Sequence, residues 1–204
     1  MFKEILTENQ KNLLPMIKNM GKGYYLAGGT AIALQIGHRG SIDFDLFSSN
    51  QLNTIKIISE IKKYNYKINA TLEESPQELT MIIEEVKITF LEYPFNIESV
   101  ISFDDIITIP DLLTLGAMKA YSLGRRSKWK DYVDLYFIIK NYFSVKEISK
   151  KAGEIFEGGF NEKLFREQLC YFADIDFSEK IEYTSDVIED EEIKKFLMNM
   201  AVEL

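Results

Sequence analysis

Apolar residues in the first half of the chain alternate between helical and strand spacing. Residues 8–19 place Leu13, Leu14 and Ile17 at helical intervals, and Thr7 precedes them as a predicted N-cap. Beyond Gly21 and Gly23, the spacing of apolar residues changes repeatedly between helical and strand intervals. From this pattern we predict helices at residues 8–19, 31–36 and 52–63, and strands at residues 24–26, 42–47, 66–72, 79–83 and 86–93.

The second half of the chain shows helical spacing. Pro110 occupies a predicted first helical position, and Ser144 with Glu147 forms a capping-box pattern. The predicted helices cover residues 111–123, 130–141, 144 onward, 161–172 and 189–202. We therefore expect an α+β protein, in which a small mixed sheet flanked by helices (residues 1–109) precedes a C-terminal helical bundle (residues 110–204).

Composition places this chain among compact globular proteins. Hydrophobic residues make up 46% of its 204 residues, enough for one domain or two small units sharing a core. No run approaches the roughly 18 apolar residues of a membrane span, so we expect a cytoplasmic protein without membrane contact. Cys170 is the only cysteine, which excludes an intramolecular disulfide; we expect its side chain to be buried.

The distribution of charge along the chain is uneven, and one segment is basic. The formal net charge of −8 argues against a protein that coats nucleic acid through a global positive field. Between Lys119 and Lys130, however, five basic residues occur without an acid. This run is a candidate local contact for a nucleic-acid backbone.

Two glycines stand between a predicted strand and a predicted helix. Gly28 and Gly29 allow close approach of a phosphate to the backbone, and the helix start offers unpaired N–H groups to an anion. Thr30 adds a hydroxyl. An ordinary tight connection explains the same glycines equally well.

Asp43 and Asp45 alternate with apolar residues along the next predicted strand. Alternate strand residues point to the same side, about 6 to 7 Å apart. Two neighbouring carboxylates need a cation or solvent, and hard oxygen ligands at this spacing suit Mg²⁺. The alternative is a solvated edge strand with its polar face outward.

These two motifs, in this order and spacing, carry a family resemblance. The string from Gly28-Gly29-Thr30 to Asp43-Phe44-Asp45 resembles the signature of the AbiEii/AbiGii-type toxins, members of the DNA polymerase beta nucleotidyltransferase superfamily. Lys119 and the segment Lys130-Asp131-Tyr132-Val133-Asp134-Leu135 resemble later motifs of that family. The resemblance covers roughly residues 24–140 and implies a nucleotidyltransferase fold.

The resemblance also implies roles for individual residues. Asp43 and Asp45 would hold a two-ion Mg²⁺ site, and Lys119 would bind triphosphate oxygens. Asp134 would orient that lysine or the nucleotide. Nucleotide contacts would further come from Gly28, Gly29, Thr30, Arg39, Ser41, Lys130 and Asp131.

Physical reasoning leaves two of these positions open. Lys119 follows Leu112 and Leu115 on an apolar helical face, so its ammonium group either reaches solvent or serves a cleft. Asp131 also suits the first turn of a helix, where the dipole favours an acid. His38, the only histidine, follows a predicted helix end and is expected in a loop or capping role.

One expected carboxylate is missing. Polymerase-beta-type enzymes usually carry a third acid on a later strand as general base, and the aligned position here is Thr89. A hydroxyl is not a base at neutral pH. Either Glu92 replaces that acid, or the metal alone activates the nucleophile, or the protein is slow or inactive.

The sequence thus favours an Mg²⁺-dependent enzyme that moves NMP from NTP to an acceptor hydroxyl. The resemblance implies the toxin of a type IV toxin–antitoxin or abortive-infection system, with tRNA as acceptor and a cognate antitoxin as partner. Two alternatives remain. One is nucleotidyl transfer to a small molecule or a protein, and the other is a non-catalytic nucleotidyltransferase-fold module that binds a partner.

Overall fold

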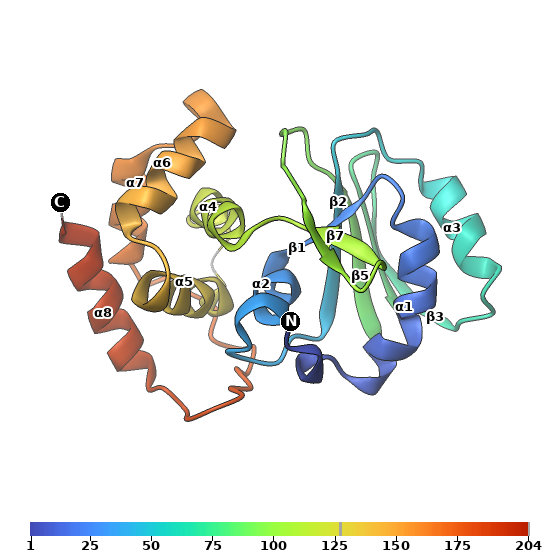
Figure 1. Cartoon of the computed structure of the whole chain (residues 1–204), viewed down its shortest axis with the longest axis horizontal. Coiled ribbons are helices and arrows are strands. Elements are labelled where there is room, and N and C mark those ends of the chain that lie inside the picture. Colours follow the sequence, from blue (N-terminus) through green and yellow to red (C-terminus); the bar gives the residue numbers. More distant parts are fainter. Residues whose placement is uncertain (127, 204) are drawn as a thin grey trace. The chain divides into compact units, whose positions relative to one another are not determined.

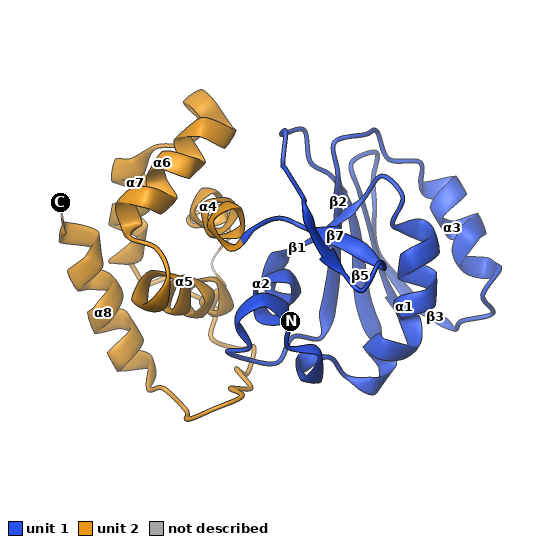
Figure 2. Ribbon diagram, viewed as in Figure 1, with its two compact units in different colours: residues 1–111 blue, residues 112–204 orange. Residues whose placement is uncertain are grey.

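The chain forms two compact units. A computed structural model describes residues 1–126 and 128–203. Unit 1 comprises Met1–Asp111 and unit 2 comprises Leu112–Leu204 (Figure 2). The predicted change from α/β to helical sequence, after residue 109, falls two residues before this division.

Unit 1 is built on a seven-stranded sheet with the order β3-β4-β5-β2-β1-β7-β6 (Figure 1). β2 pairs with β5 and β1 pairs with β7 in parallel, whereas the other pairs are antiparallel, so the predicted mixed sheet is confirmed. The strands are β1 (Tyr25–Ala27), β2 (Asp43–Ser48), β3 (Ile68–Glu74), β4 (Glu78–Ile83), β5 (Val86–Glu92), β6 (Ile101–Phe103) and β7 (Ile107–Ile109).

The helices of unit 1 follow the predicted signals. α1 (Glu8–Met20) begins with a capping box between Thr7 and Gln10. α2 (Gly28–Ile36) ends at Gly37, whose φ of 64° is left-handed. With α3 (Thr54–Lys62) and the 3₁₀ turn η1 (Lys3–Ile5), these helices flank the sheet. Figure 1 shows α1 and α3 on one side of it and α2 on the other.

The two faces of the sheet differ in chemistry. Phe44 and Leu46 of β2 and Ile88 and Phe90 of β5 are 0 to 1% exposed and belong to the core. The residues between them, including Asp43 and Asp45, are only half-buried. Strand alternation therefore places Asp43 and Asp45 of β2 on the other face, together with Lys87 and Thr89 of β5.

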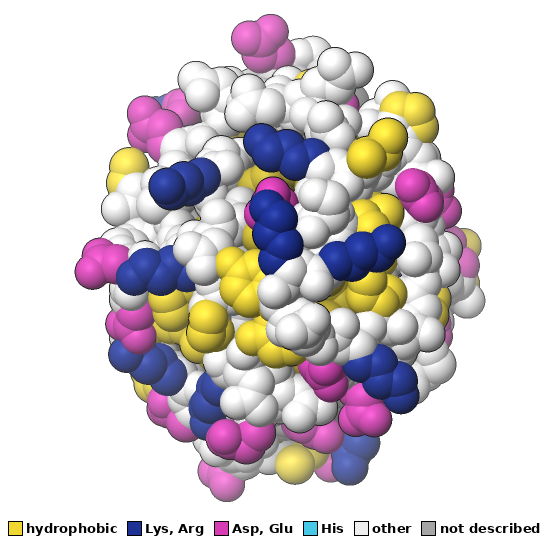
Figure 3. All heavy atoms as spheres, turned by 90° about the vertical axis from the view of Figure 1, so that its right-hand side faces the viewer, with side chains coloured by type: hydrophobic (Ala, Val, Ile, Leu, Met, Phe, Trp, Pro, Cys, Tyr) yellow, Lys and Arg dark blue, Asp and Glu magenta, His cyan; other side chains and the backbone are white. Residues whose placement is uncertain are grey.

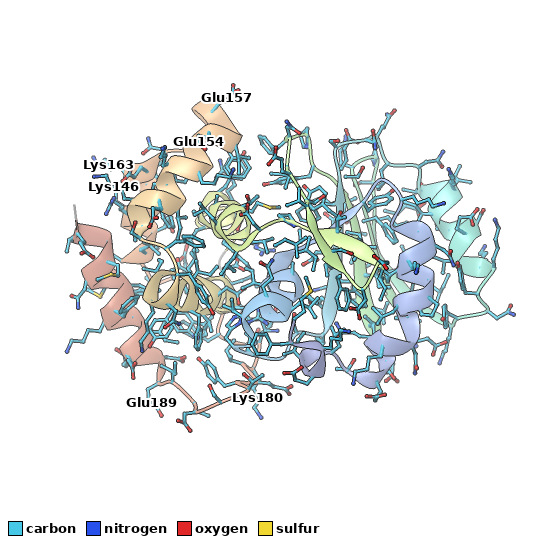
Figure 4. All side chains as sticks on the ribbon, in the orientation of Figure 1. Lys146, Glu154, Glu157, Lys163, Lys180 and Glu189 are labelled. Carbon is cyan, nitrogen blue, oxygen red and sulfur yellow. The ribbon has the colours of Figure 1, made fainter. Side chains whose placement is uncertain are left out.

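Unit 2 consists of helices. They are α4 (Leu112–Ser122), α5 (Trp129–Asn141), α6 (Val145–Phe156), η2 (Glu157–Gly159), α7 (Glu162–Leu169) and α8 (Asp190–Val202). The predicted capping box of Ser144 and Glu147 is present at α6. Charged side chains such as Lys146, Glu154 and Lys163 point outward from α6 and α7 (Figure 4).

Two sequence expectations are wrong, and one element was not predicted. Pro110 is not the first residue of a helix: α4 begins at Leu112, and the carbonyl of Pro110 accepts a hydrogen bond from Gln35. The short hairpin of β6 and β7 was not predicted. Cys170 is exposed, because it lies just beyond the end of α7.

Among the described residues, no helix has the length and apolar character that crossing a membrane requires.

Candidate active site

Asp43 and Asp45 lie on one face of β2, as the strand alternation predicts. Their register partners on β5 are Lys87 and Thr89. Paired residues of neighbouring strands project to the same face, and Asp43 Oδ2 lies 2.7 Å from the Lys87 ammonium nitrogen. A cation therefore already neutralises one of the two carboxylates.

Gly28 and Asp45 occupy adjoining space. Gly28 begins α2 and has a φ of +67°, in the left-handed region. A Cβ atom at this position would lie 2.0 Å from Asp45 Oδ2. The absence of a side chain at Gly28 thus lets the Asp45 carboxylate approach the first turn of α2.

The N-terminus of α2 is suited to an anion. Its N-cap, Ala27, makes no side-chain hydrogen bond to the helix. Free N–H groups at a helix start bind phosphate well, and an acid-held Mg²⁺ beside them would bring phosphates there. This helix start suits a phosphate, and the phosphate contacts of Gly28 and Gly29 stay a prediction.

Thr30 and Ser41 support the start of β2. The Thr30 hydroxyl is 1% exposed, lies 2.8 Å from Ser41 Oγ and hydrogen bonds the backbone carbonyl of Asp43. These contacts fix the position of the Asp43 backbone. Arg39 is 2% exposed and donates to the carbonyl of Gly40 at 2.9 Å. In this structure these three residues position the backbone around Asp43.

The position of the missing third acid is now defined. Thr89 pairs directly with Asp45, so it occupies the place beside the two carboxylates. Glu92 pairs with Ser48, on the opposite parity of the same strands, and its side chain belongs to the other face. Glu92 therefore does not replace the acid, and that hypothesis is wrong.

Unit 2 contains a buried ionic cluster. The Lys119 ammonium nitrogen lies 2.5 Å from Asp131 Oδ1 and 2.8 Å from Asp134 Oδ2. Its side chain is 5% exposed, and those of Asp131 and Asp134 are 2% and 0% exposed. Lys119 from α4 is thus held by two acids of α5, three residues apart on one helical face.

Arg126 joins this cluster and was not predicted. Its Nε and Nη2 atoms lie 2.8 and 3.0 Å from the two Asp131 carboxylate oxygens. The cluster therefore contains two cations and two acids. Helical spacing does not reveal Arg126, because it precedes α5 in a connecting segment; a two-pronged arginine–carboxylate pair is visible only in three dimensions.

Lys130 does not join the cluster. Its ammonium nitrogen lies 2.9 Å from Glu179, which also forms an ion pair with Lys128. The hydrogen bond from Lys128, followed by that from Lys130, lowers the pKa of Glu179 to about 2. Arg125 lies over the Tyr121 ring and donates to the carbonyl of Gly159. The basic side chains between residues 119 and 130 therefore contact acidic side chains, the Tyr121 ring and backbone carbonyls within unit 2.

Asp43 and Asp45 are suitable ligands for Mg²⁺. The described residues contain no group of three or more His, Cys, Asp or Glu side chains able to enclose a metal. Mg²⁺ does not require one, because it commonly binds one or two carboxylates and takes its other ligands from substrate phosphates and water. The ion pair of Asp43 with Lys87 shows that this carboxylate accommodates a cation.

Comparisons with known proteins show the fold. No family model matches the chain. An uncharacterized protein of Aquifex aeolicus (strain VF5) is 27% identical over 206 residues, covering 95% of this chain and 98% of that protein. The chain spans nearly the whole length of this relative.

Solved structures, among them two that are named as nucleotidyltransferases, are similar to the chain. MenT4, a nucleotidyltransferase toxin of Mycobacterium tuberculosis H37Rv, has a TM-score of 0.60 at 12% identity over 95% of this chain and 80% of its own. JHP933 of Helicobacter pylori has a TM-score of 0.59 at 18% identity over 96% and 91%. An H. pylori protein provisionally named a nucleotidyltransferase gives 0.56 at 16% over 95% and 91%. The predicted nucleotidyltransferase fold is confirmed.

Proposed function

We propose that this protein is an Mg²⁺-dependent nucleotidyltransferase that moves NMP from NTP to an acceptor hydroxyl. The observation that carries the proposal is the Asp43–Asp45 pair on one face of β2, with Gly28 clearing space for the Asp45 carboxylate at the start of α2. The fold shared with a nucleotidyltransferase toxin also supports the proposal.

The geometry of unit 1 supports a proposed role for each of these residues. Asp43 and Asp45 would hold Mg²⁺, which would supply neutralising charge at the phosphates. The backbone N–H groups of Gly28 and Gly29 bind phosphate oxygens, while Thr30 and Ser41 keep the backbone of Asp43 in place. The acceptor oxygen then forms a bond to the α-phosphorus as the bond to pyrophosphate breaks. Positioning and charge neutralisation supply most of the acceleration.

Lys119 is the proposed triphosphate contact in unit 2. Asp131 and Asp134 orient its ammonium group, and Arg126 compensates the second charge on the acids. A lysine carries three donors, so two carboxylates leave one N–H direction for a phosphate oxygen. Lys130 is the weaker candidate for a nucleotide contact, because Glu179 holds it.

We further propose that the protein is the toxin of a type IV toxin–antitoxin or abortive-infection pair, that its acceptor is tRNA, and that a cognate antitoxin restrains it. The similarity to a nucleotidyltransferase toxin supports this. A protein or small molecule is the second candidate acceptor. The intramolecular partners of Lys128 and Lys130 favour it, because they reduce the positive charge available to an RNA backbone.

Label transfer from each of the four α-³²P-NTPs tests the proposal. The protein is incubated with Mg²⁺ and total cellular RNA, and RNA, protein and small-molecule fractions are counted separately. The Asp43→Asn, Asp45→Asn double variant should lose all transfer. The Asp104→Asn, Asp105→Asn variant is the matched control: it removes the same charge from the β6–β7 turn, where both residues have positive φ and Asn is tolerated.

Each outcome assigns a function. Labelled RNA that depends on Asp43 and Asp45 supports the toxin enzyme acting on RNA. Label in the protein or small-molecule fraction identifies the second acceptor class. Retained NTP binding without transfer into any fraction would overturn the enzyme and favour a partner-binding module.

A further inference from the structure

Lys87 lies beside the first of the two candidate metal ligands. It pairs in register with Asp43 across β2 and β5, and its ammonium nitrogen lies 2.7 Å from Asp43 Oδ2. The side chains of Lys87 and Asp43 are 40% and 27% exposed, so ions from solution can reach both of them. On its other side Lys87 pairs with Ile82 of β4, which carries no charge. In the described part of the chain, Asp43 is the acid that forms an ion pair with Lys87.

The two partners of this ion pair differ in how firmly they are held. The backbone carbonyl of Asp43 accepts a hydrogen bond from the Thr30 hydroxyl, which is buried. Lys87 carries its charge at the end of a flexible four-carbon stem. A change of partner would therefore move the Lys87 ammonium group and leave the backbone of Asp43 in place.

Mg²⁺ and the Lys87 ammonium group would compete for the same carboxylate. Mg²⁺ binds carboxylate oxygens at about 2.0 to 2.1 Å and demands near-ideal octahedral geometry. Two cations beside one oxygen atom repel each other, because the energy of two charges grows as their separation falls. A metal ion at Asp43 Oδ2 would therefore displace Lys87, and the displaced ammonium group would need another anion.

We infer that Lys87 is a substrate-binding residue that exchanges partners: it holds Asp43 until Mg²⁺-NTP binds, and then binds a triphosphate oxygen. This inference rests on the proposed nucleotidyl transfer. A lysine ammonium group offers three donors and binds phosphate as a point charge. Because Lys87 leaves Asp43 more readily when a triphosphate accepts it, nucleotide strengthens metal binding. Metal strengthens nucleotide binding by the same factor.

The first test measures binding of Mn²⁺, a spectroscopic substitute for Mg²⁺, by electron paramagnetic resonance. We expect Lys87→Met to bind Mn²⁺ alone about two- to fivefold more tightly, because the competing exposed ion pair is gone. Calorimetry at saturating Mn²⁺ then measures inorganic triphosphate, a probe that has no base and needs no acceptor. Lys87→Met should bind it about tenfold more weakly, the loss of a hydrogen bond between charged groups. Lys63→Met breaks the exposed pair of Lys63 with Glu60, is the matched control and should change neither affinity.

A double-mutant cycle separates a direct exchange from a change in local charge. In the absence of metal, Asp43→Asn releases Lys87, so inorganic triphosphate should bind about two- to fivefold more tightly than to the parent. This gain should disappear when Asp43→Asn is combined with Lys87→Met, because the freed ammonium group is its source. Lys87→Arg keeps the positive charge and should keep the gain in the Asp43→Asn protein. Thermal melting of each variant shows that it is folded.

The outcomes separate this inference from the proposed function. A parent that binds Mn²⁺ through Asp43 and Asp45, with both affinities unchanged by Lys87→Met, overturns the role of Lys87 alone. A gain in triphosphate affinity that persists in the double variant also overturns that role, because it is then an effect of net charge. A parent that binds neither Mn²⁺ nor triphosphate overturns both this inference and the proposed function.

Discussion

At the scale of single residues, the candidate site depends on the absence of a Cβ atom at Gly28. A Cβ there would lie 2.0 Å from Asp45 Oδ2, and the φ of +67° disfavours any side chain. We expect Gly28→Ala to lower the free energy of unfolding by at least about 1 to 2 kcal/mol, the cost of a left-handed conformation. It should also abolish nucleotidyl transfer, because the Asp45 carboxylate must move.

Gly153→Ala is the control for this substitution. Gly153 lies in α6 with nothing within 4 Å of an added Cβ, so alanine there should stabilise the protein by about 0.4 to 1 kcal/mol. Urea unfolding and label transfer measure both effects. Full transfer activity in Gly28→Ala would show that nucleotidyl transfer does not require the observed position of the Asp45 carboxylate.

Sequence reasoning worked for residues whose role depends on local pattern. The D-x-D pair could be placed on one strand face, and Gly28 between a strand and a helix, because both depend on neighbours in the chain. Lys87 and Arg126 were missed. Each meets its acid across a strand pair or from a connecting segment, and such pairs depend on register, which one sequence does not show.

At the scale of elements, capping signals located helices more reliably than proline did. The N-cap predicted at Thr7 and the capping box predicted at Ser144 gave the correct starts of α1 and α6, since both satisfy backbone N–H groups locally. The β6–β7 hairpin was missed because its turn uses Asp104 and Asp105, both with positive φ, where Asn-Gly or Asp-Gly would have marked it. Alternation of Ile101, Phe103, Ile107 and Ile109 was the available signal.

The junction of α4 and α5 depends on the ionic cluster. Removing Lys119 leaves Asp131 and Asp134 buried without the cation they share. We expect Lys119→Met to lower the free energy of unfolding by about 3 to 5 kcal/mol. Lys119→Met combined with Asp134→Leu should cost less than the sum of the single changes, because the two side chains interact directly.

Urea unfolding of the two single variants and the double variant measures this coupling. Lys150→Met, an exposed lysine of α6, is the control and should change stability by less than about 0.5 kcal/mol. The double variant should remain without transfer activity even where it recovers stability. Additive costs would show that Lys119 and Asp134 do not stabilise each other.

Glu179 makes the start of α5 sensitive to acid. The pKa of Glu179 is lowered to about 2 in the folded protein by Lys128 and then Lys130, below its ordinary value of about 4.3. Its stabilising contribution is therefore complete above pH of about 4.3 and is lost as pH falls toward 2. The stability difference between the parent and Glu179→Gln should shrink over this interval.

Chemical unfolding at pH 6, 4.5 and 3.5 measures this difference. Glu182→Gln, which removes an exposed acid of the same segment, is the matched control. A constant difference between the parent and Glu179→Gln across these pH values would contradict the assigned ion pairs.

At the scale of the whole molecule, charge limits how RNA can be bound. The formal net charge is −8, and on the face that carries α3, Lys and Arg lie interspersed with acidic and apolar side chains (Figure 3). In unit 2, Lys119, Lys128 and Lys130 lie against acids. We therefore expect the proposed tRNA acceptor to be bound through few phosphate contacts and to be recognised mainly near its reacting end.

This expectation has a quantitative form. The logarithm of the association constant falls with the logarithm of salt concentration by about 0.7 to 0.9 for each neutralised phosphate. We expect a slope shallower than about −2 for fluorescently labelled tRNA titrated across a range of KCl concentrations at constant Mg²⁺. Glu179→Gln should steepen that slope, because it releases Lys128 and Lys130 from their shared acid. A parent slope near −5 that Glu179→Gln does not change would contradict this expectation. It would show that an extended basic surface elsewhere on the protein binds the tRNA backbone.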